Sequence, residues 1–175
     1  MGDHDGAFEE FMAGSAHRLH RVAFLLAGDL ERAEEMTQHA LVRTYVAWPR
    51  IRTADAYGYA RRILINLHTD WWRRGLRRER PVPDVPDRPA RGPDPGDALA
   101  ARDAVTRALR RLSHRERAVV VCRYYLDLTE QQTADELGVA LGTVKSTNAR
   151  ALRKLRIAPE LSPAGDGSAK VKGVS

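Results

Sequence analysis

Apolar residues in the first part of the chain recur at steps of three and four, the spacing of one face of an α-helix. This pattern predicts a helix over 8–27. Asp29 can cap a second helix over 30–46, which stops before Pro49. A third helix is expected over 55–74. Nothing here alternates convincingly with period two, so no sheet is predicted.

The sequence of the second half of the chain predicts shorter helices, with clear signals for where they start and stop. An Ala- and Leu-rich helix is expected over 97–112. The segments Ser-His-Arg-Glu from Ser113 and Thr-Glu-Gln-Gln from Thr129 are capping boxes, each of which opens a helix. Gly138 ends the second of these helices, because glycine tolerates the left-handed turn. A last helix is expected over about 142–157.

A proline-rich segment separates the two helical parts. Residues 81–97 hold six prolines and two glycines, which excludes a helix or a central strand. We therefore predict an all-α fold of two small helical domains, over 5–78 and 98–157, joined by an extended linker over 79–97. The tail over 158–175 has few apolar residues and is predicted to be disordered.

The charge of the chain comes mainly from arginine and is unevenly distributed. The chain has 29 Lys and Arg against 23 Asp and Glu, a net charge of +6. Residues 48–80 hold nine basic and three acidic side chains, and 97–157 hold twelve and seven, whereas 1–47 hold four and eight. The two basic blocks favour a polyanionic partner. The alternative is an Arg- and Ala-rich composition that reflects a GC-rich genome.

Several classes of protein are excluded by composition. No apolar run approaches the ~18 residues of a membrane span, and the acidic N-terminus lacks a signal pattern, so a cytoplasmic protein is expected. The single cysteine, Cys122, excludes an internal disulfide framework and a cysteine-based zinc site. The glycines form no phosphate-binding loop and the histidines no metal spacing. We therefore predict no enzymatic activity, no metal and no cofactor.

Residues 129–155 carry the strongest functional pattern. Ala134 is small enough for a close helix crossing, and Gly138 follows where a turn requires positive φ. Val139 and Val144 supply apolar contacts, and together these residues predict a helix-turn-helix. Its second helix presents candidate DNA-binding residues: Lys145, Ser146, Thr147, Asn148, Arg150 and Arg153. An ordinary helical hairpin with a solvated basic face is the alternative.

Three segments in order resemble bacterial sigma factors of the extracytoplasmic-function type, the small two-domain class of the sigma-70 superfamily. Residues 28–48 (GDLERAEEMTQHALVRTYVAW) are similar to the family's core-polymerase-binding helix, and 56–74 (AYGYARRILINLHTDWWRR) to its promoter-melting helix. Residues 112–156, which include the phrase GTVKS, resemble its C-terminal DNA-binding domain. The Trp71-Trp72 pair is most like an actinobacterial branch.

The resemblance implies a region 2-like domain over 5–78 and a region 4-like domain over 98–157. The helix over 30–46 would bind the clamp helices of the large subunits of core RNA polymerase. The residues implied are Glu34, Glu35, Gln38 and Leu41. His39 departs from the acidic residue that usually follows that glutamine. The C-terminal domain would bind the −35 promoter element and rest on the polymerase flap.

The resemblance also implies that the basic block over 48–80 recognises and melts the −10 element. The loop over 48–54 would form a pocket for a flipped base, and the helix over 55–74 would hold the separated strand by stacking and phosphate neutralisation. The residues implied are Trp48, Arg50, Arg52, Tyr59, Arg61, Arg62, Asn66, Trp71, Arg73 and Arg74. For Tyr59 and Trp71, core packing is the alternative.

Two departures from the family pattern limit what carries over to the −35 element. Ala140 stands where a serine cap is common, so the recognition helix starts less firmly. Thr147 and Asn148 replace an often basic or apolar pair, so the family's −35 specificity does not transfer.

In the family the linker threads toward the active-site cleft of the polymerase, and an inert tether is the alternative here.

The sequence thus predicts a cytoplasmic sigma factor that binds core RNA polymerase and directs promoter recognition and transcription initiation. The family also implies a protein antagonist, an anti-sigma factor, which nothing in the chain identifies. One alternative is an independent helix-turn-helix regulator, which the arginine-aromatic helix over 55–74 argues against. The other is an interaction module that mimics a sigma domain, which the basic recognition helix argues against.

Overall fold

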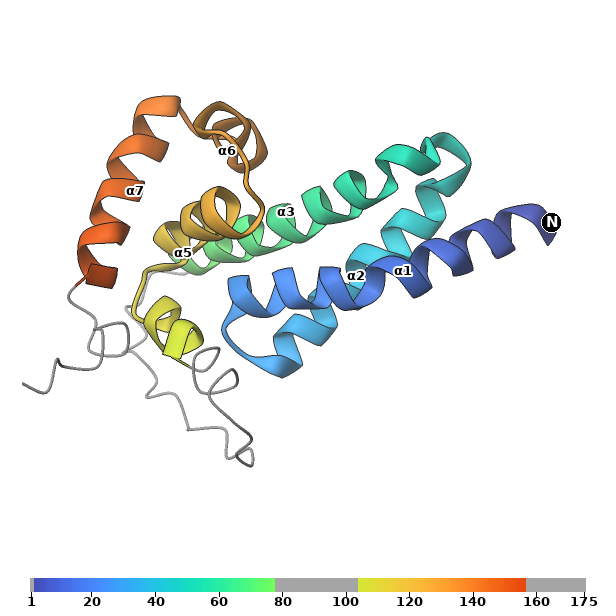
Figure 1. Cartoon of the computed structure of the whole chain (residues 1–175), viewed down its shortest axis with the longest axis horizontal. Helices are drawn as coiled ribbons and strands as arrows, with labels where there is room; N and C mark the ends of the chain where they lie inside the picture. The colour runs from blue at the N-terminus through green and yellow to red at the C-terminus, as the bar shows by residue number, and fades with distance from the viewer. Residues whose placement is uncertain (1, 78–103, 157–175) are drawn as a thin grey trace, which may run out of the picture.

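All secondary structure in residues 2–77 and 104–156, the part of the chain that the computed structural model describes, is helical (Figure 1). The N-terminal half contains α1 (Gly2–Ala27), α2 (Leu30–Ala47), η1 (Trp48–Arg50), η2 (Thr53–Asp55) and α3 (Ala56–Arg77). The C-terminal half contains a helical segment over 104–110, α5 (His114–Val120), η3 (Val121–Tyr125), α6 (Glu130–Leu137) and α7 (Leu141–Arg156). The prediction of an all-α fold with two helical domains is confirmed.

The predicted linker over 79–97 and the predicted disordered tail over 158–175 lie outside the described residues. The predicted boundaries at 78, 98 and 157 lie there too, and they stay predictions. In the described ranges no helix combines the length and the apolar character that crossing a lipid bilayer requires.

The first turn between helices is fixed by Gly28 and Asp29. Gly28 has φ +83°, a left-handed conformation that ends α1, and its amide donates to the Phe24 carbonyl at 2.8 Å. The Asp29 carboxylate then accepts from the Arg32 amide at 3.0 Å, which confirms the predicted cap of α2. The reversal lets the apolar sides of α1 and α2 pack together.

The C-terminal half begins its helices at the predicted capping boxes. The Ser113 hydroxyl accepts from the Glu116 amide at 3.3 Å, and the Glu116 carboxylate accepts from the Ser113 amide at 2.9 Å. Thr129 and Gln132 exchange the equivalent bonds at 3.1 and 2.8 Å. The helix after Ser113 does not stay regular, because η3 is a π-helical turn.

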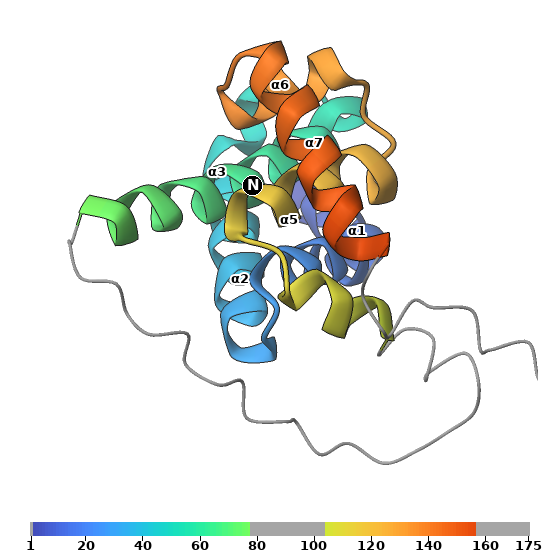
Figure 2. The ribbon, with the colours of Figure 1, turned by 90° about the vertical axis from the view of Figure 1, so that its left-hand side faces the viewer.

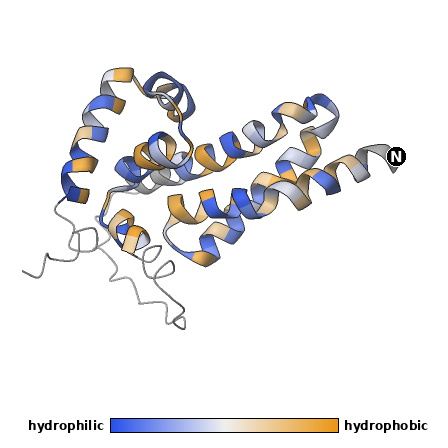
Figure 3. Ribbon diagram, viewed as in Figure 1, coloured by the Kyte–Doolittle hydropathy of each residue, from blue (hydrophilic) through white to orange (hydrophobic). Residues whose placement is uncertain are grey.

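One hydrophobic core runs through both halves of the molecule. Fully buried leucines of α1 and α3, Leu19 and Leu64, belong to the same cluster as Val119 of α5, Leu137 of α6 and Val144 of α7. Figure 3 shows apolar and polar residues alternating along the helices, so that each helix contributes an apolar side. The two domains are therefore packed against each other, an arrangement that the sequence analysis did not predict.

A buried arginine joins the two halves at the end of α1. The Arg117 guanidinium of α5 donates to the carbonyls of Leu26 at 3.4 Å and Ala27 at 3.1 Å. It also donates to carbonyls in its own half, those of Leu109, Arg110 and Leu112, at 3.0, 3.2 and 3.4 Å. The last carbonyls of a helix lack partners within the helix, and a cation there is favourable.

Gly28 gives Arg117 and Arg110 the room to reach this helix end. The Arg110 guanidinium donates to the Gly28 carbonyl at 2.8 Å. A Cβ atom at position 28 would lie 2.6 Å from Nη1 of Arg117, so a side chain there would displace the guanidinium. The glycine thus serves the turn and the contact between the halves.

We expect Arg117→Met, which keeps an apolar stem but removes the guanidinium, to lower the free energy of unfolding by about 2–3 kcal/mol. The reason is that several buried carbonyls lose their donor at once. Chemical denaturation followed by circular dichroism measures the change. Arg43→Met, at an exposed position of α2, is the matched control. A loss for Arg117→Met no larger than that of the control would contradict this account.

Candidate nucleic-acid interface

An exposed polar stripe follows α3 along its length. Tyr59 is 39% exposed, the Arg62 side chain is 63% exposed, and Asn66 and Arg73 are exposed as well. Their spacing of three, four and seven residues places them on one side of the helix. We call these four residues the α3 stripe. Figure 2 shows the C-terminal end of α3 projecting beyond the other helices. The side chain of Arg74 lies outside the described residues.

The loop before α3 is anchored by an aromatic cluster. Trp48 is only 6% exposed, and its ring lies 5.2 Å from those of Phe8 and Phe11 of α1. The predicted DNA contact of Trp48 is therefore wrong for its side chain, since apolar packing against α1 buries it. Arg50 and Arg52, which follow in the loop, are exposed as a DNA contact requires.

Trp71 lies outside the α3 stripe, on the side of the helix that faces α2 and α5. It is 41% exposed, with the Arg32 guanidinium 3.7 Å from its ring centroid and the His114 ring 5.0 Å away. The packing alternative thus describes part of the Trp71 ring, and its DNA contact stays a prediction. One part of the ring packs between the domains, and the rest stays accessible.

The second helix of the helix-turn-helix presents most of its predicted residues to solvent. Gly138 has φ +61° and Ala134 is 3% exposed, as the pattern predicted for the turn and the helix crossing. Of the six predicted residues on α7, the exposed ones are Lys145, Ser146, Arg150 and Arg153. Together they form a polar, basic surface of the kind that enters a major groove.

Two predicted residues of α7 do not lie free on that surface. Thr147 is fully buried, because it shares the inward side of α7 with Val144 and Ala151, three and four residues away. Its predicted DNA contact is therefore wrong for this fold. Asn148 is half-buried, and its Nδ2 donates to the Tyr124 hydroxyl at 3.0 Å. That bond holds the amide against η3.

The outer side of α2 carries the predicted polymerase-binding residues together with apolar ones. Glu34, Glu35 and Gln38 are exposed, whereas Leu41 is half-buried and packs against the core. Leu41 is therefore less available for a partner than predicted. The sequence analysis overlooked Val42 and Val46, which are 61% and 76% exposed. Their position out of phase with the buried residues of α2 is a signal that could have revealed them.

The α3 helix and the helix-turn-helix meet at a buried carboxylate, Glu136 of α6. Glu136 is 7% exposed, and its two oxygens accept from Nη2 of Arg61 at 2.9 Å and from Nε of Arg62 at 3.4 Å. The Arg61 side chain is only 19% exposed. The sequence analysis missed Glu136, although an acid between Thr133 and Leu137, on the inward side of α6, signals a buried partner.

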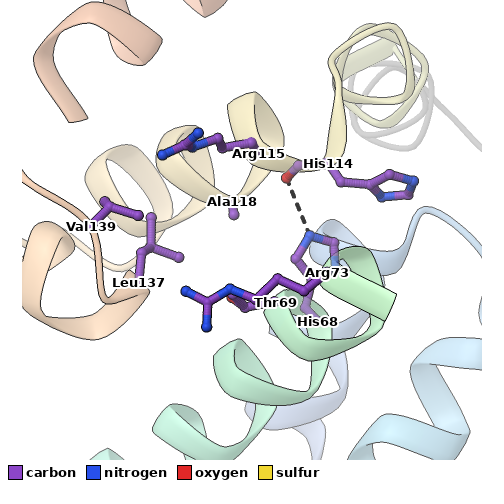
Figure 4. Close-up of a pocket in the computed structure, with 8 residues that line it drawn as sticks. All are labelled: His68, Thr69, Arg73, His114, Arg115, Ala118, Leu137 and Val139. Atoms are coloured by element: carbon purple, nitrogen blue, oxygen red, sulfur yellow. Dashed lines mark hydrogen bonds between the residues drawn. The ribbon is translucent and has the colours of Figure 1, made fainter. Parts of the chain in front are cut away.

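A second polar contact between the halves joins two histidines. Nε2 of His68, on α3, donates to the His114 carbonyl, on α5, at 3.2 Å (Figure 4). Both residues line a cavity of about 30 Å³ between α3 and the C-terminal half, enough for roughly one water molecule. Burial lowers the pKa of the His68 imidazole to about 4, and nearby Arg117 and Arg32 also disfavour its charged form.

Comparison with known proteins matches both halves to one family. Residues 14–78 match the model of Sigma-70 region 2, and 108–156 match that of Sigma-70, region 4. An RNA polymerase sigma-E factor of Streptomyces avermitilis is 40% identical over 152 residues, which cover 85% of this chain and 83% of the relative. The ECF RNA polymerase sigma factor SigL of Mycobacterium tuberculosis is 32% identical, with 79% and 81% covered.

A solved structure supports the fold. It is the sigma factor RpoE in complex with the anti-sigma factor NepR from Bartonella quintana. It aligns with a TM-score of 0.64 at 20% identity, over 89% of this chain and 98% of that one. At this identity the likeness concerns the arrangement of the helices.

The buried His68 predicts a pH dependence of stability. Its folded pKa lies below its unfolded value near 6.5, so the unfolded chain binds the proton more readily and stability falls as the pH drops from about 6.5 toward 4. His68→Gln keeps a donor near the Nε2 position but does not titrate. We expect this variant to lose about 1–2 kcal/mol less than wild type between pH 7 and pH 5.

Denaturation curves at the two pH values measure this difference. His17→Gln, at an exposed histidine of α1, should behave like wild type. Equal losses in wild type and His68→Gln would show that His68 does not govern the acid sensitivity.

Proposed function

We propose a division of promoter recognition between the two halves of this chain. The chain belongs to the extracytoplasmic-function family of RNA polymerase sigma factors. The family membership makes it a promoter-recognition subunit of RNA polymerase. The observation that carries the division of labour is the presence of two basic, exposed helical surfaces, the α3 stripe and the outer side of α7, on separate domains.

The outer side of α7 is proposed to read the −35 element in the major groove. Lys145, Arg150 and Arg153 are exposed and can neutralise phosphates or bond base edges. Ser146 is also exposed, although its hydroxyl donates to the Thr143 carbonyl at 3.2 Å. In this proposal Thr147 supports the helix from inside rather than contacting DNA.

The loop with Arg50 and Arg52 and the α3 stripe are proposed to bind the melted −10 element. Tyr59 offers an exposed ring for base stacking, and Arg62 and Arg73 flank it with positive charge. Stacking of bases on aromatic side chains, combined with phosphate neutralisation, is the usual way to hold single strands. Trp48 positions this loop through its packing on α1.

Core RNA polymerase is proposed to dock on the outer side of α2. That surface combines the carboxylates Glu34 and Glu35 with exposed Val42 and Val46, a mixture of acidic and apolar groups suited to a protein partner. The polymerase supplies the chemistry of RNA synthesis, so the chain itself needs no catalytic group. The proposal places the chain in the cytoplasm, where the polymerase works.

An anti-sigma factor is the second protein partner that we propose. The structural relative described above was solved with an anti-sigma factor bound. CnrH, which aligns with a TM-score of 0.55, was solved in complex with the cytosolic domain of CnrY. A partner of this kind would have to cover the surfaces that bind polymerase or DNA. Its identity is not indicated by any residue of this chain.

Run-off transcription with purified core polymerase and a library of promoter fragments tests the proposed function. We expect transcripts from defined start sites in the presence of the chain and none from core alone. Aligned upstream sequences should reveal two conserved elements. Binding of duplex DNA by the chain alone, without transcripts and without a complex with core, would instead favour an independent regulator.

We expect Arg153→Ala to weaken promoter binding by the holoenzyme and to make its salt dependence shallower, by a slope of roughly one per lost phosphate contact. Fluorescence anisotropy on a promoter duplex, measured at several salt concentrations, gives both quantities. Arg18→Ala, at an exposed position of α1, removes a charge outside both α7 and the proposed polymerase surface and serves as control. An unchanged slope for Arg153→Ala would exclude a phosphate contact by this residue.

A further inference from the structure

The contact between α3 and α6 suggests how DNA binding is regulated, an inference that rests on the proposed function. We propose that Glu136 occupies, on Arg61 and Arg62, the place of a DNA phosphate, and that promoter DNA binds only after this carboxylate has been released. We call the arrangement in which Glu136 binds both arginines the closed arrangement.

The chemistry of the contact matches phosphate recognition. Each oxygen of Glu136 accepts from a different arginine, at 2.9 and 3.4 Å. Guanidinium groups bind carboxylates and phosphates through the same donors. While both arginines donate to Glu136, Nη2 of Arg61 and Nε of Arg62 are not available to a nucleic acid.

The pairing is also incomplete, which allows a phosphate to compete. Nε of Arg61 is buried and has no hydrogen-bond partner among the described residues. A buried donor without a partner costs free energy. A phosphate offers more acceptor oxygens than a carboxylate and can bind the donor that Glu136 leaves unpaired.

The closed arrangement cannot serve both promoter elements at once. The −10 and −35 elements are separated by about 25 base pairs, or ~85 Å at ~3.4 Å per base pair. In the structure the helix proposed to bind the first element touches the helix-turn-helix proposed to bind the second (Figure 1). The two halves must therefore separate before both elements are bound.

The charge of the two halves predicts that Glu136 opposes their separation. Residues 48–80 carry a net charge of +6 and 97–157 a net charge of +5, from nine basic against three acidic and twelve against seven side chains. Segments of like net charge repel each other when the halves that contain them are packed together. A carboxylate at their junction offsets this repulsion, so its removal favours the open form.

The experiment measures the distance between the halves by fluorescence energy transfer. Dyes are attached to full-length protein at Ala13→Cys in α1 and Ala149→Cys in α7, both exposed positions. The native Cys122 is buried, and burial raises the pKa of its thiol to about 12, so it does not compete for the dyes. Glu136→Gln should lower the transfer efficiency. Asp135→Asn, its exposed neighbour, is the matched control and should not.

Affinity for DNA is measured in parallel with a short single-stranded oligonucleotide of mixed sequence, because phosphate contacts are independent of sequence. We expect Glu136→Gln to bind it about tenfold more tightly than wild type, the effect of losing one charge-assisted contact in the closed arrangement. Asp135→Asn should bind about as wild type. The proposal would be overturned if Glu136→Gln had the transfer efficiency and the affinity of wild type. It would also be overturned if the transfer efficiency of this variant fell while its affinity did not rise.

Exchanging the charges of Arg61 and Glu136 distinguishes the loss of their ion pair from misfolding of a variant. Glu136→Arg should lower the transfer efficiency further, and Arg61→Glu combined with Glu136→Arg should restore it. Failure of the double variant to recover would overturn the role of this ion pair. Whether wild type binds core polymerase is measured separately in a native gel, so failure of the proposed function is distinguished from failure of this inference.

Discussion

The contact of the Arg117 guanidinium with the end of α1 is the interaction on which the arrangement of the two halves depends. It supplies donors to carbonyls of Leu26 and Ala27, which the helix itself leaves unpaired, and to carbonyls in its own half. Moving the C-terminal half away leaves the carbonyls of Leu26 and Ala27 without this donor. With α5 fixed there, α6 lies beside α3, and the contacts of His68 and Glu136 follow from that position.

The helices were predictable because their caps and turns are formed by residues close together in the sequence. The interface between the two halves was not, because its partners lie far apart in the sequence. The caps at Asp29, Ser113 and Thr129 and the turn at Gly138 involve residues within four positions of one another, so the sequence displays both partners together. Arg61 and Glu136 lie 75 residues apart. Nothing local distinguishes an arginine that will bind DNA from one that pairs with a distant carboxylate.

The candidate site was predictable as a surface but not side chain by side chain. A helix in a DNA-binding domain has an inward side as well as an outward one, and short polar residues such as Thr147 are compatible with either. Trp48 posed the same problem, because an aromatic residue beside arginines suits both base stacking and a core. Packing decides between these roles, and packing against α1 became visible only in the folded chain.

The closed arrangement covers Arg61, which we propose to bind DNA, but leaves the proposed polymerase-binding surface of α2 open. Glu34, Val42 and Val46 on α2 are exposed, whereas Arg61 is nearly buried against Glu136. On the proposed assignment, docking of polymerase on α2 requires no prior separation of the halves, whereas binding of both promoter elements does. Separation exposes apolar core residues such as Leu137, and a partner that is already bound can offset that cost. The geometry thus favours an order of events in which polymerase binds first and DNA second.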